Sequence, residues 1–486
     1  MSGYSSAVKL EIEKFDGRIN FGLWQVQVKD VLIQSDKKYP HGITALPWIR
    51  MSCGNQVHNC TRALVGVEMQ ARFRSVPRRN SWSGLIPSEY TFMVEYDSSL
   101  NYDCRCFLKG ELCLIPNNSE GDTLTFIVAE STTTNLDNLV SDTPKDVTCF
   151  HAFVPMLPSP RALEDGTLLI PPMAIQVTIF PNSGFAICIN FSHVVVDGKG
   201  FHHFMKFWAS VCGSKENNIV LPSHDRDMIE DPNGLKAIFL ETVWNSPRER
   251  FMSLGHNVLS DNNHVRLTFV LTRDHVDNLK KYVSTKCQRH GLEISHLSTF
   301  VVTCSLFWVC KIKLEQDIKT NDDEELYLCF WLDCRTRNIG ELEIPSTYFG
   351  NCLVNGIVAI KRSKLVGQNG IFEAAIAIGS KVREMQSEPY KCAERLKSIF
   401  SEVATIGHRM LRIASSPKLD VYETDFGWGK PKLSEVVHLH SQLVSLSDCR
   451  DKEDGIIEVG VALGRTQIHK FNTILEEELA NIVVCD

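Results

Sequence analysis

The clearest hydrophobic patterns in this chain begin near residue 105. Short runs of apolar residues predict strands at 107–115 and 123–129, and β-rich runs predict two more at 174–180 and 185–191. Pro181-Asn182-Ser183-Gly184 separates the last two runs and is a typical turn sequence. We therefore expect a hairpin whose second strand ends just before residue 193.

A helix is predicted directly after this hairpin, because apolar side chains recur there at helical spacing. They are Phe201, Phe204, Trp208 and Val211. Residues 213–262 are polar and contain several prolines, which indicates a long crossover. Beyond the crossover, strands are predicted at 265–271, 326–333, 352–361, 418–424, 435–440 and 456–463, and helices at 276–287, 298–311, 371–384, 390–404 and 465–480. The elements alternate without a strict rhythm, so the predicted fold is α/β, with mixed sheets flanked by helices.

Composition excludes several classes of function. The chain is 43% hydrophobic and 22% charged, as expected for a globular protein, and its net charge of -7 gives no general attraction to nucleic acid or anionic membranes. No apolar run approaches the roughly 18 residues of a membrane span, and the N-terminal residues lack an apolar signal core. The 17 cysteines include no CxxC pair. We therefore expect a cytoplasmic protein with reduced thiols and no metal ion, membrane or nucleic-acid partner.

The first candidate for chemistry is His193, which follows the strand predicted at 185–191 and precedes Asp197-Gly198 on a strand-to-helix loop. A histidine with a pKa near 6.5 can remove a proton from an acceptor hydroxyl at cytosolic pH. Asp197 could orient the imidazole, as in a catalytic triad. The tight turn at Asp197-Gly198 instead favours a carboxylate that points back into the protein. Without further context, such a histidine is more often structural.

The second candidate is Asp425-Phe426-Gly427-Trp428-Gly429, a pentapeptide expected by chance in roughly one chain of this length in ten thousand. Its glycines suit a tight backbone path with the two rings buried. Together, the two motifs resemble those of the plant BAHD acyl-CoA-dependent acyltransferases. Tyr348-Phe349-Gly350-Asn351-Cys352 further resembles the clade that acylates anthocyanins and other phenolic glucosides. The resemblance covers about residues 105–480.

The resemblance implies two chloramphenicol-acetyltransferase-like domains that meet at a solvent channel. It implies that His193 is the general base and that Asp197 is structural and pairs with an arginine, for which Arg335 is the candidate. The other residues with an expected structural role are Gly198, Asp425, Gly427, Trp428 and Gly429. We place the domains at 101–212 and 263–486, with 213–262 as the linker.

The family's chemistry predicts a reaction between two small molecules. An acyl-CoA, with malonyl-CoA favoured and hydroxycinnamoyl-CoA as the alternative, would donate its acyl group to a hydroxyl of a phenolic or flavonoid glucoside. No cofactor is permanently bound, and a monomer is expected. Hydroxyl groups and a helix N-terminus suit the phosphates of coenzyme A. The candidates for its site are Ser298, Thr299, Ser415, Ser416 and Lys418, although helix capping or turn formation is the commoner explanation for each one taken alone.

Residues 1–100 lack the opening elements of that family, so we expect an incomplete first domain. Lys14-Phe15-Asp16-Gly17 and Phe21-Gly22-Leu23-Trp24 instead resemble the start of a copia-type retrotransposon gag protein, and 11–34 has helical spacing. The segment is interpreted as foreign, either through a fusion or through a join of unrelated exons. The alternative to an active acyltransferase is therefore a non-catalytic remnant that serves at most as an interaction module.

Overall fold

The structure is a computed structural model, and its description covers the following parts of the chain. They are residues 8–12, 71–75, 91–97, 104–106, 112–114, 125–131, 135–157, 161–162, 168–169, 173–192, 195–213, 220–223, 263–292, 297–315, 321–335, 344–388, 409–450 and 455–484. His193, most of the predicted crossover 213–262, the helix predicted at 390–404 and nearly all of 11–34 lie outside these residues.

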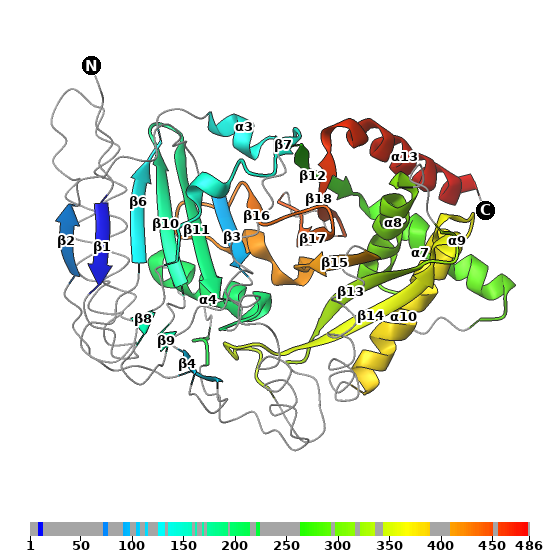
Figure 1. Ribbon diagram of the computed structural model, residues 1–486, viewed down its shortest axis with the longest axis horizontal. Helices are drawn as coiled ribbons and strands as arrows, with labels where there is room; N and C mark the ends of the chain where they lie inside the picture. The colour runs from blue at the N-terminus through cyan, green and yellow to red at the C-terminus, as the bar shows by residue number, and fades with distance from the viewer. Residues whose placement is uncertain are drawn as a thin grey trace.

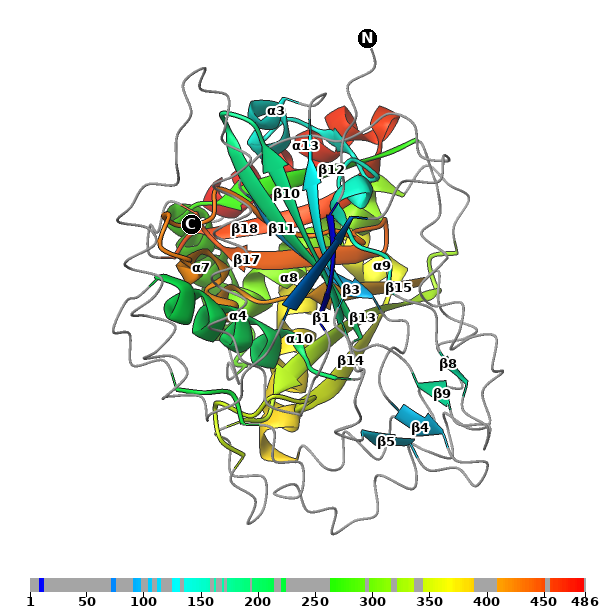
Figure 2. The ribbon, with the colours of Figure 1, turned by 90° about the vertical axis from the view of Figure 1, so that its left-hand side faces the viewer.

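The first half of the chain builds a seven-stranded mixed sheet in the order β16-β3-β11-β10-β6-β1-β2. Its centre is the predicted hairpin of β10 (Met173–Phe180) and β11 (Gly184–Ser192), which pair antiparallel. Asn182 and Gly184 adopt positive φ in the connecting turn, as the turn sequence predicts. β6 (Thr125–Glu130) runs parallel to β10. Figure 2 shows these strands twisting across one another.

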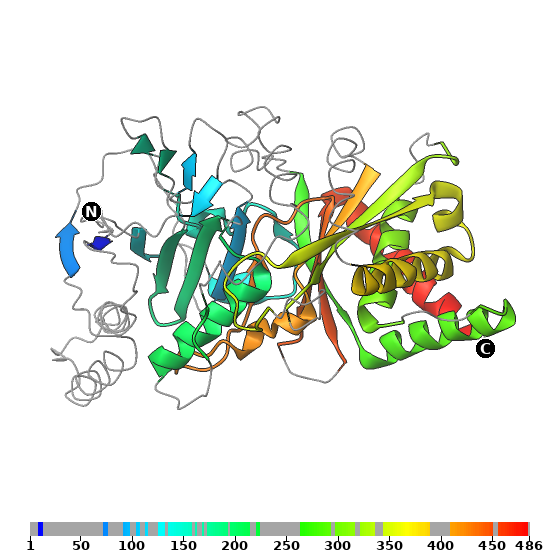
Figure 3. The ribbon, with the colours of Figure 1, turned by 90° about the horizontal axis from the view of Figure 1, so that it is seen from below.

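The predicted helix after the hairpin is α4 (Gly198–Gly213), which lies beside β10 and β11 in Figure 3. Its apolar side faces the sheet, since the ring of Phe201 stacks on that of Phe191 in β11 with 4.4 Å between centroids. Phe201, Phe204 and Trp208 are all buried. Burial of three large aromatic side chains on one helix face anchors the helix that follows the His193 loop.

The second half builds another seven-stranded sheet, in the order β14-β13-β15-β17-β18-β12-β7. Its strands are β12 (His264–Leu271), β13 (Glu325–Asp333), β14 (Leu353–Lys361), β15 (Met410–Ala414), β17 (Leu443–Asp448) and β18 (Ile457–Gly464). Its helices are α7 (Arg273–Arg289), α8 (Thr299–Leu314), α9 (Arg362–Val366), α10 (Gly370–Ser387) and α13 (Ile468–Val484). The helices gather on the face of this sheet that points away from the first half (Figures 1 and 3).

α8 is the centre of the second half. Thirteen of its sixteen residues are buried, and it packs against α10, α13 and the sheet. A helix that is apolar on all sides has no solvent-facing stripe, so it can only be stable inside a layered core. The predicted fold class of two mixed sheets with flanking helices is therefore confirmed.

Each half also contributes a strand to the sheet of the other. β7 (Lys145–Asp146) pairs with β12 in the second sheet, and β16 (Ser434–Val436) pairs with β3 in the first. Local hydrophobic patterns cannot reveal such exchanges, because the two- and three-residue strands are too short to show a period. The two sheets lie side by side along the long axis of the molecule (Figure 1).

Two expectations from the sequence differ from the structure. The strand predicted at 418–424 is a pair of short 3₁₀ turns, Pro417–Leu419 and Val421–Glu423, because Asp420 between them has a left-handed φ of 47°. In addition, the segment 1–100 was set apart from the first domain, yet β1 (Val8–Ile12), β2 (Ala71–Ser75) and β3 (Thr91–Asp97) are strands of its sheet. The parallel pairing of β3 with β11 joins segments about ninety residues apart, which no local pattern shows.

Among the described residues, no helix is both long and apolar enough to cross a membrane, and no cluster of three metal-ligating side chains is found.

The position of β3 predicts how the protein responds to shortening. Of the strands that the structure describes, a chain begun just before Thr91 keeps β3 and loses β1 and β2 at one end of the sheet, whereas a chain begun after Asp97 also loses the strand between β11 and β16. Because each ladder hydrogen bond contributes about 1 kcal/mol net, the second chain should be less stable by several kcal/mol. Thermal unfolding of both chains measures the difference, and equal melting temperatures would show that β3 is dispensable.

Candidate active site

The loop that carries His193 is held between β11 and α4. β11 ends at Ser192, and α4 begins at Gly198, so five residues connect the two elements. Asp197 caps the helix, because its Oδ1 accepts a hydrogen bond from the backbone N–H of Gly200 at 2.9 Å. A Cβ at Gly200 would come within 2.6 Å of the Val196 side chain, so only glycine fits this close approach.

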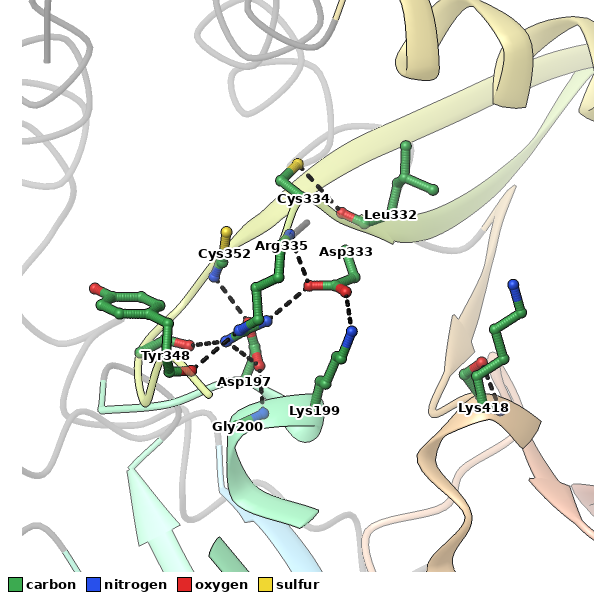
Figure 4. A network of polar contacts seen from close by, with 12 residues as sticks. Asp197, Lys199, Gly200, Leu332, Asp333, Cys334, Arg335, Tyr348, Cys352 and Lys418 are labelled. Atoms are coloured by element: carbon green, nitrogen blue, oxygen red, sulfur yellow. Dashed lines mark hydrogen bonds and ion pairs between the residues drawn. The ribbon is translucent and has the colours of Figure 1, made fainter. Parts of the chain in front are cut away.

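The predicted partner of Asp197 is confirmed. Arg335, just after the end of β13, places Nη2 2.9 Å from Asp197 Oδ1, and both side chains are completely buried (Figure 4). The second carboxylate oxygen of Asp197 accepts the backbone N–H of Cys352 at 2.8 Å. This carboxylate therefore joins the start of α4 to the Tyr348–Cys352 motif and to β13.

Each nitrogen of the Arg335 guanidinium has an acceptor. Nε donates to the carbonyl oxygen of Tyr348 at 3.0 Å, and Nη2 donates to that of Gly350 at 2.6 Å. Nη1 donates to Asp333 Oδ1 at 2.8 Å, and the other oxygen of Asp333 lies 2.7 Å from Nζ of Lys199 on α4. Burial by itself lowers the pKa of Arg335, but the charges and hydrogen bonds of Asp197 and Asp333 more than offset this and raise its pKa above the ordinary value. The arginine therefore stays charged.

These contacts bear on the triad interpretation. Both oxygens of Asp197 are engaged, by Gly200 and Arg335 on one side and by Cys352 on the other. A carboxylate held in this way serves the architecture of the loop. His193 lies outside the described residues, so its role as the base stays a prediction.

The pentapeptide 425–429 forms a tight turn that Asp425 closes. Its Oδ1 accepts the backbone N–H groups of Gly427 at 2.8 Å and Gly429 at 3.0 Å. Both glycines have positive φ, of 98° and 106°, which side chains rarely tolerate. Phe426 is buried, as expected, but Trp428 is 43% exposed, so the expectation that both rings are buried is wrong for the tryptophan.

Trp428 lies far from the loop that carries His193. Its ring meets Phe185 edge-on, with 5.1 Å between centroids, and Phe185 is the second residue of β11. The strand runs on for seven residues from Phe185 to Ser192, about 23 Å at the usual rise of 3.3 Å per residue. Trp428 therefore lies at the opposite end of β11 from the His193 loop, and donation from its indole to a reacting carbonyl beside His193 is excluded.

The five residues predicted to bind coenzyme A fall into two groups. Ser298 is the N-cap of α8, where its hydroxyl accepts from the backbone N–H of Val301, and Thr299 is the first residue of that helix. Ser416 caps the 3₁₀ turn Pro417–Leu419, which contains the exposed Lys418 (Figure 4). Capping accounts for both serines, and a role in coenzyme A binding stays a prediction.

Ser415 has a different environment. It lines a small cavity between the two halves, whose walls also include His202 of α4 and Glu435 of β16. Burial, followed by the charge of Lys206, lowers the pKa of His202 to about 3, so this histidine is neutral. The sequence did not single out this cavity, because its walls come from several stretches of the chain that lie far apart in the sequence.

Two members of the ionic network were also missed. Lys199 and Asp333 extend the Asp197–Arg335 pair into a chain of four charges that crosses between the halves (Figure 4). The only available signal was the placement of Asp333 two residues before Arg335, which lets a carboxylate hydrogen-bond to the arginine locally.

The network predicts an unequal response to two matched substitutions. Asp197→Asn removes a buried charge and leaves Arg335 without it, which should lower the free energy of unfolding by roughly 3–5 kcal/mol. Asp323→Asn, in an exposed pair with Lys361, should leave the free energy of unfolding almost unchanged. Urea unfolding of both variants and of His193→Ala gives the comparison. A small effect of Asp197→Asn, no larger than that of His193→Ala, would contradict the assignment.

Comparison with known proteins identifies the family. The family model described as "Transferase family" matches residues 109–478. The chain is 39% identical over 375 residues to coumaroyl-CoA:anthocyanidin 3-O-glucoside-6''-O-coumaroyltransferase 1 of Arabidopsis thaliana, covering 74% of this chain and 78% of that protein. It is 33% identical over 378 residues to malonyl-coenzyme A:anthocyanin 3-O-glucoside-6''-O-malonyltransferase of Dahlia pinnata, covering 75% and 78%.

Solved structures agree on the fold. Vinorine synthase superposes with a TM-score of 0.54 at 14% identity, over 98% of this chain and 94% of that one. The F. graminearum protein TRI101, in complex with coenzyme A and T-2 mycotoxin, gives a TM-score of 0.52 at 12% identity, over 96% and 94%. These identities are too low to show more than a shared two-domain fold. The family match and the closer relatives show that the chain belongs to the BAHD family and is an acyltransferase that transfers groups other than amino-acyl groups.

Proposed function

We propose that this protein transfers an acyl group from an acyl-CoA thioester to a hydroxyl of a phenolic or flavonoid glucoside. The proposal rests mainly on the relatives at 39% and 33% identity. Their names all give glucosides of anthocyanidins, anthocyanins or phenols as the acceptors. The buried Asp197–Arg335 pair supports it, since this pair holds the end of the His193 loop in one conformation.

The proposed chemistry needs one base and a good leaving group. His193 removes the proton of the acceptor hydroxyl as its oxygen attacks the thioester carbonyl carbon. The tetrahedral intermediate then expels the thiolate of coenzyme A, which takes up the proton from the imidazolium. A positioned base contributes on the order of 10²–10⁴-fold to such a step. Asp197 has no proton to transfer in this scheme and acts on the geometry of the loop.

The donor we propose first is p-coumaroyl-CoA, with malonyl-CoA as the second candidate. Sequence motifs alone favoured malonyl-CoA. The two relatives at 39% and 38% identity are both named coumaroyltransferases, however, whereas the malonyltransferases from Dahlia pinnata and Nicotiana tabacum are 33% identical. The two acyl groups make opposite demands, since a malonyl carboxylate needs a cationic partner and a coumaroyl ring needs an apolar wall.

Several further assignments belong to the same proposal. Residues 101–212, together with the strands β1, β2 and β3, form the first acyltransferase domain, and residues 263–486 form the second, with the exchanged strands β7 and β16 joining them. Ser415, Ser416 and Lys418 contribute to the coenzyme A site from one loop, and Ser298 and Thr299 from the start of α8. The protein acts as a cytoplasmic monomer without a permanently bound cofactor.

The decisive test is acyl transfer by the purified protein. With p-coumaroyl-CoA and an anthocyanidin 3-O-glucoside, we expect free thiol and an acylated glucoside in equal amounts. His193→Ala should lower the rate by at least about a hundredfold, because the base is lost, while coenzyme A binding persists.

His203→Ala is the matched control for this substitution. His203 lies on α4, where a ring nitrogen is 2.8 Å from the Val220 carbonyl oxygen, and it should not affect the chemical step. Retention of activity in His193→Ala within a few-fold would remove this histidine as the base. Absence of transfer from either donor in the unaltered protein would leave a non-catalytic remnant as the better description.

A further inference from the structure

A continuous series of aromatic rings connects the pentapeptide turn to the end of β11. We call it the aromatic ladder, and its seven members come from β11, α4 and the turn. In order of contact, they are Phe185, Trp428, Phe426, Trp208, Phe204, Phe201 and Phe191. The ladder begins and ends on the same strand, and it bridges along α4 the whole length that separates the two ends of β11.

Each step of the ladder is a ring contact of ordinary geometry. Trp428 stacks on Phe426 at 6.4 Å, Phe426 meets Trp208 edge-on at 5.0 Å, and Trp208 lies 6.2 Å from Phe204. Phe204 is 6.5 Å from Phe201, whose ring is stacked on Phe191 at 4.4 Å with only 5° between the planes. Ring pairs at such separations attract each other, so the seven rings form one continuous series of contacts.

Trp208 is the member on which the continuity depends. It is 1% exposed, and it is the ring of α4 that contacts the pentapeptide turn. Phe201, Phe204 and Trp208 are spaced by three and four residues and share one face of the helix. Removal of the Trp208 ring would separate the fixed turn from the two phenylalanines that hold the first turns of α4 against the sheet.

We propose that Trp208 is a positioning residue for acyl transfer, acting through Phe204, Phe201 and Phe191 on the segment that carries His193. This inference rests on the proposed function. Of the described residues on either side of His193, Phe191 has its ring stacked on that of Phe201, and Asp197 is paired with Arg335. The ionic network fixes the Asp197 end from the second half of the protein, and the ladder fixes the Phe191 end from the turn.

Small displacements of such a segment carry large kinetic consequences. A misplacement of about 1 Å at a reacting group can lower a rate by about 10²-fold, although no substrate contact is lost. A ring that acts on the position of the loop should therefore affect kcat more than KM. A ring that only fills the hydrophobic core should affect the stability of the protein and leave kcat and KM unchanged.

The chain offers a matched control in Trp308. This tryptophan is also on a helix and fully buried, but it lies in the α8 core of the second half, away from the ladder. Trp208→Leu and Trp308→Leu remove the same ring from comparable surroundings. Trp208→Phe is the conservative variant, because it retains a ring in contact with its neighbours.

The experiment compares these three variants with the unaltered protein, at a temperature well below every melting transition. We expect Trp208→Leu to lower kcat by about tenfold or more with KM changed by less than about twofold, and Trp208→Phe to recover most of the loss. Trp308→Leu should lower the melting temperature and leave kcat within about twofold. Hydrogen–deuterium exchange of a peptide spanning 191–197 should increase in Trp208→Leu alone.

The kinetic and exchange measurements test the proposed function and the positioning role of Trp208 separately. If the unaltered protein transfers no acyl group, the function is wrong, and the exchange measurement still decides whether Trp208 holds the segment. Equal exchange in Trp208→Leu and Trp308→Leu would overturn the positioning role. So would a loss of kcat in Trp308→Leu as large as that in Trp208→Leu, or a Trp208→Leu variant whose kcat is unchanged.

Discussion

The buried ion pair between Asp197 and Arg335 is the contact on which the rest of this structure depends. Its two residues are 138 positions apart and belong to different halves of the chain. Neither charge can be buried without the other, since an isolated charge inside a protein costs several kilocalories per mole. Asp197, which closes the five-residue connection between β11 and α4, can therefore be buried only when β13 and the Tyr348–Cys352 segment are correctly placed beside it.

The same constraint explains why the two halves are so closely joined. Each half donates a short strand to the sheet of the other, and further ion pairs connect the two sheets and the two halves. Arg266 of β12 in the second sheet holds Glu435 of β16 in the first sheet at 2.5 Å, and Arg450 of the second half holds Asp142 of the first half at 2.9 Å. The Tyr348–Phe349 segment is in turn hydrogen-bonded to Ser223, in the stretch between the halves. A site that lies between two domains needs this degree of connection, because its geometry is only as precise as the relative placement of the domains.

The two signature motifs of the chain have different physical roles. The pentapeptide 425–429 is a stiff local turn, closed by one carboxylate and two glycines with positive φ, at the end of β11 remote from His193. Its role in the structure does not require contact with the substrate. Phe426 packs on Trp208 and thereby contacts the helix that begins at the candidate site. Phe349 of the Tyr348–Cys352 motif meets Phe204 on that helix, so both motifs converge on α4.

Most elements were predictable from local patterns. The β10–β11 hairpin, α4, α7, α8, α10, α13 and the longer strands of the second half all show the expected periodicity, because each buries one face or is wholly buried. Prediction failed where the backbone conformation of a single residue determines the secondary structure. At Asp420, a left-handed φ gives two short 3₁₀ turns in place of the predicted strand. Prediction also missed β7, which is too short to have a period of its own, whereas the strand predicted at 435–440 overlaps β16 without revealing that β16 joins the first sheet.

The candidate site, like the fold, was only partly predictable from the sequence. The sequence by itself determined the motifs, the identity of the family they resemble, and Arg335 as the partner of Asp197. Only the tertiary structure decided that Lys199 and Asp333 extend this pair, that Trp428 lies at the far end of β11 with its ring half exposed, and that β3 enters the first sheet between β11 and β16. The physical reason is that hydrophobic period and turn chemistry are properties of neighbouring residues, whereas ion pairing, ring contacts and sheet order are set by distances between segments that are far apart in the chain.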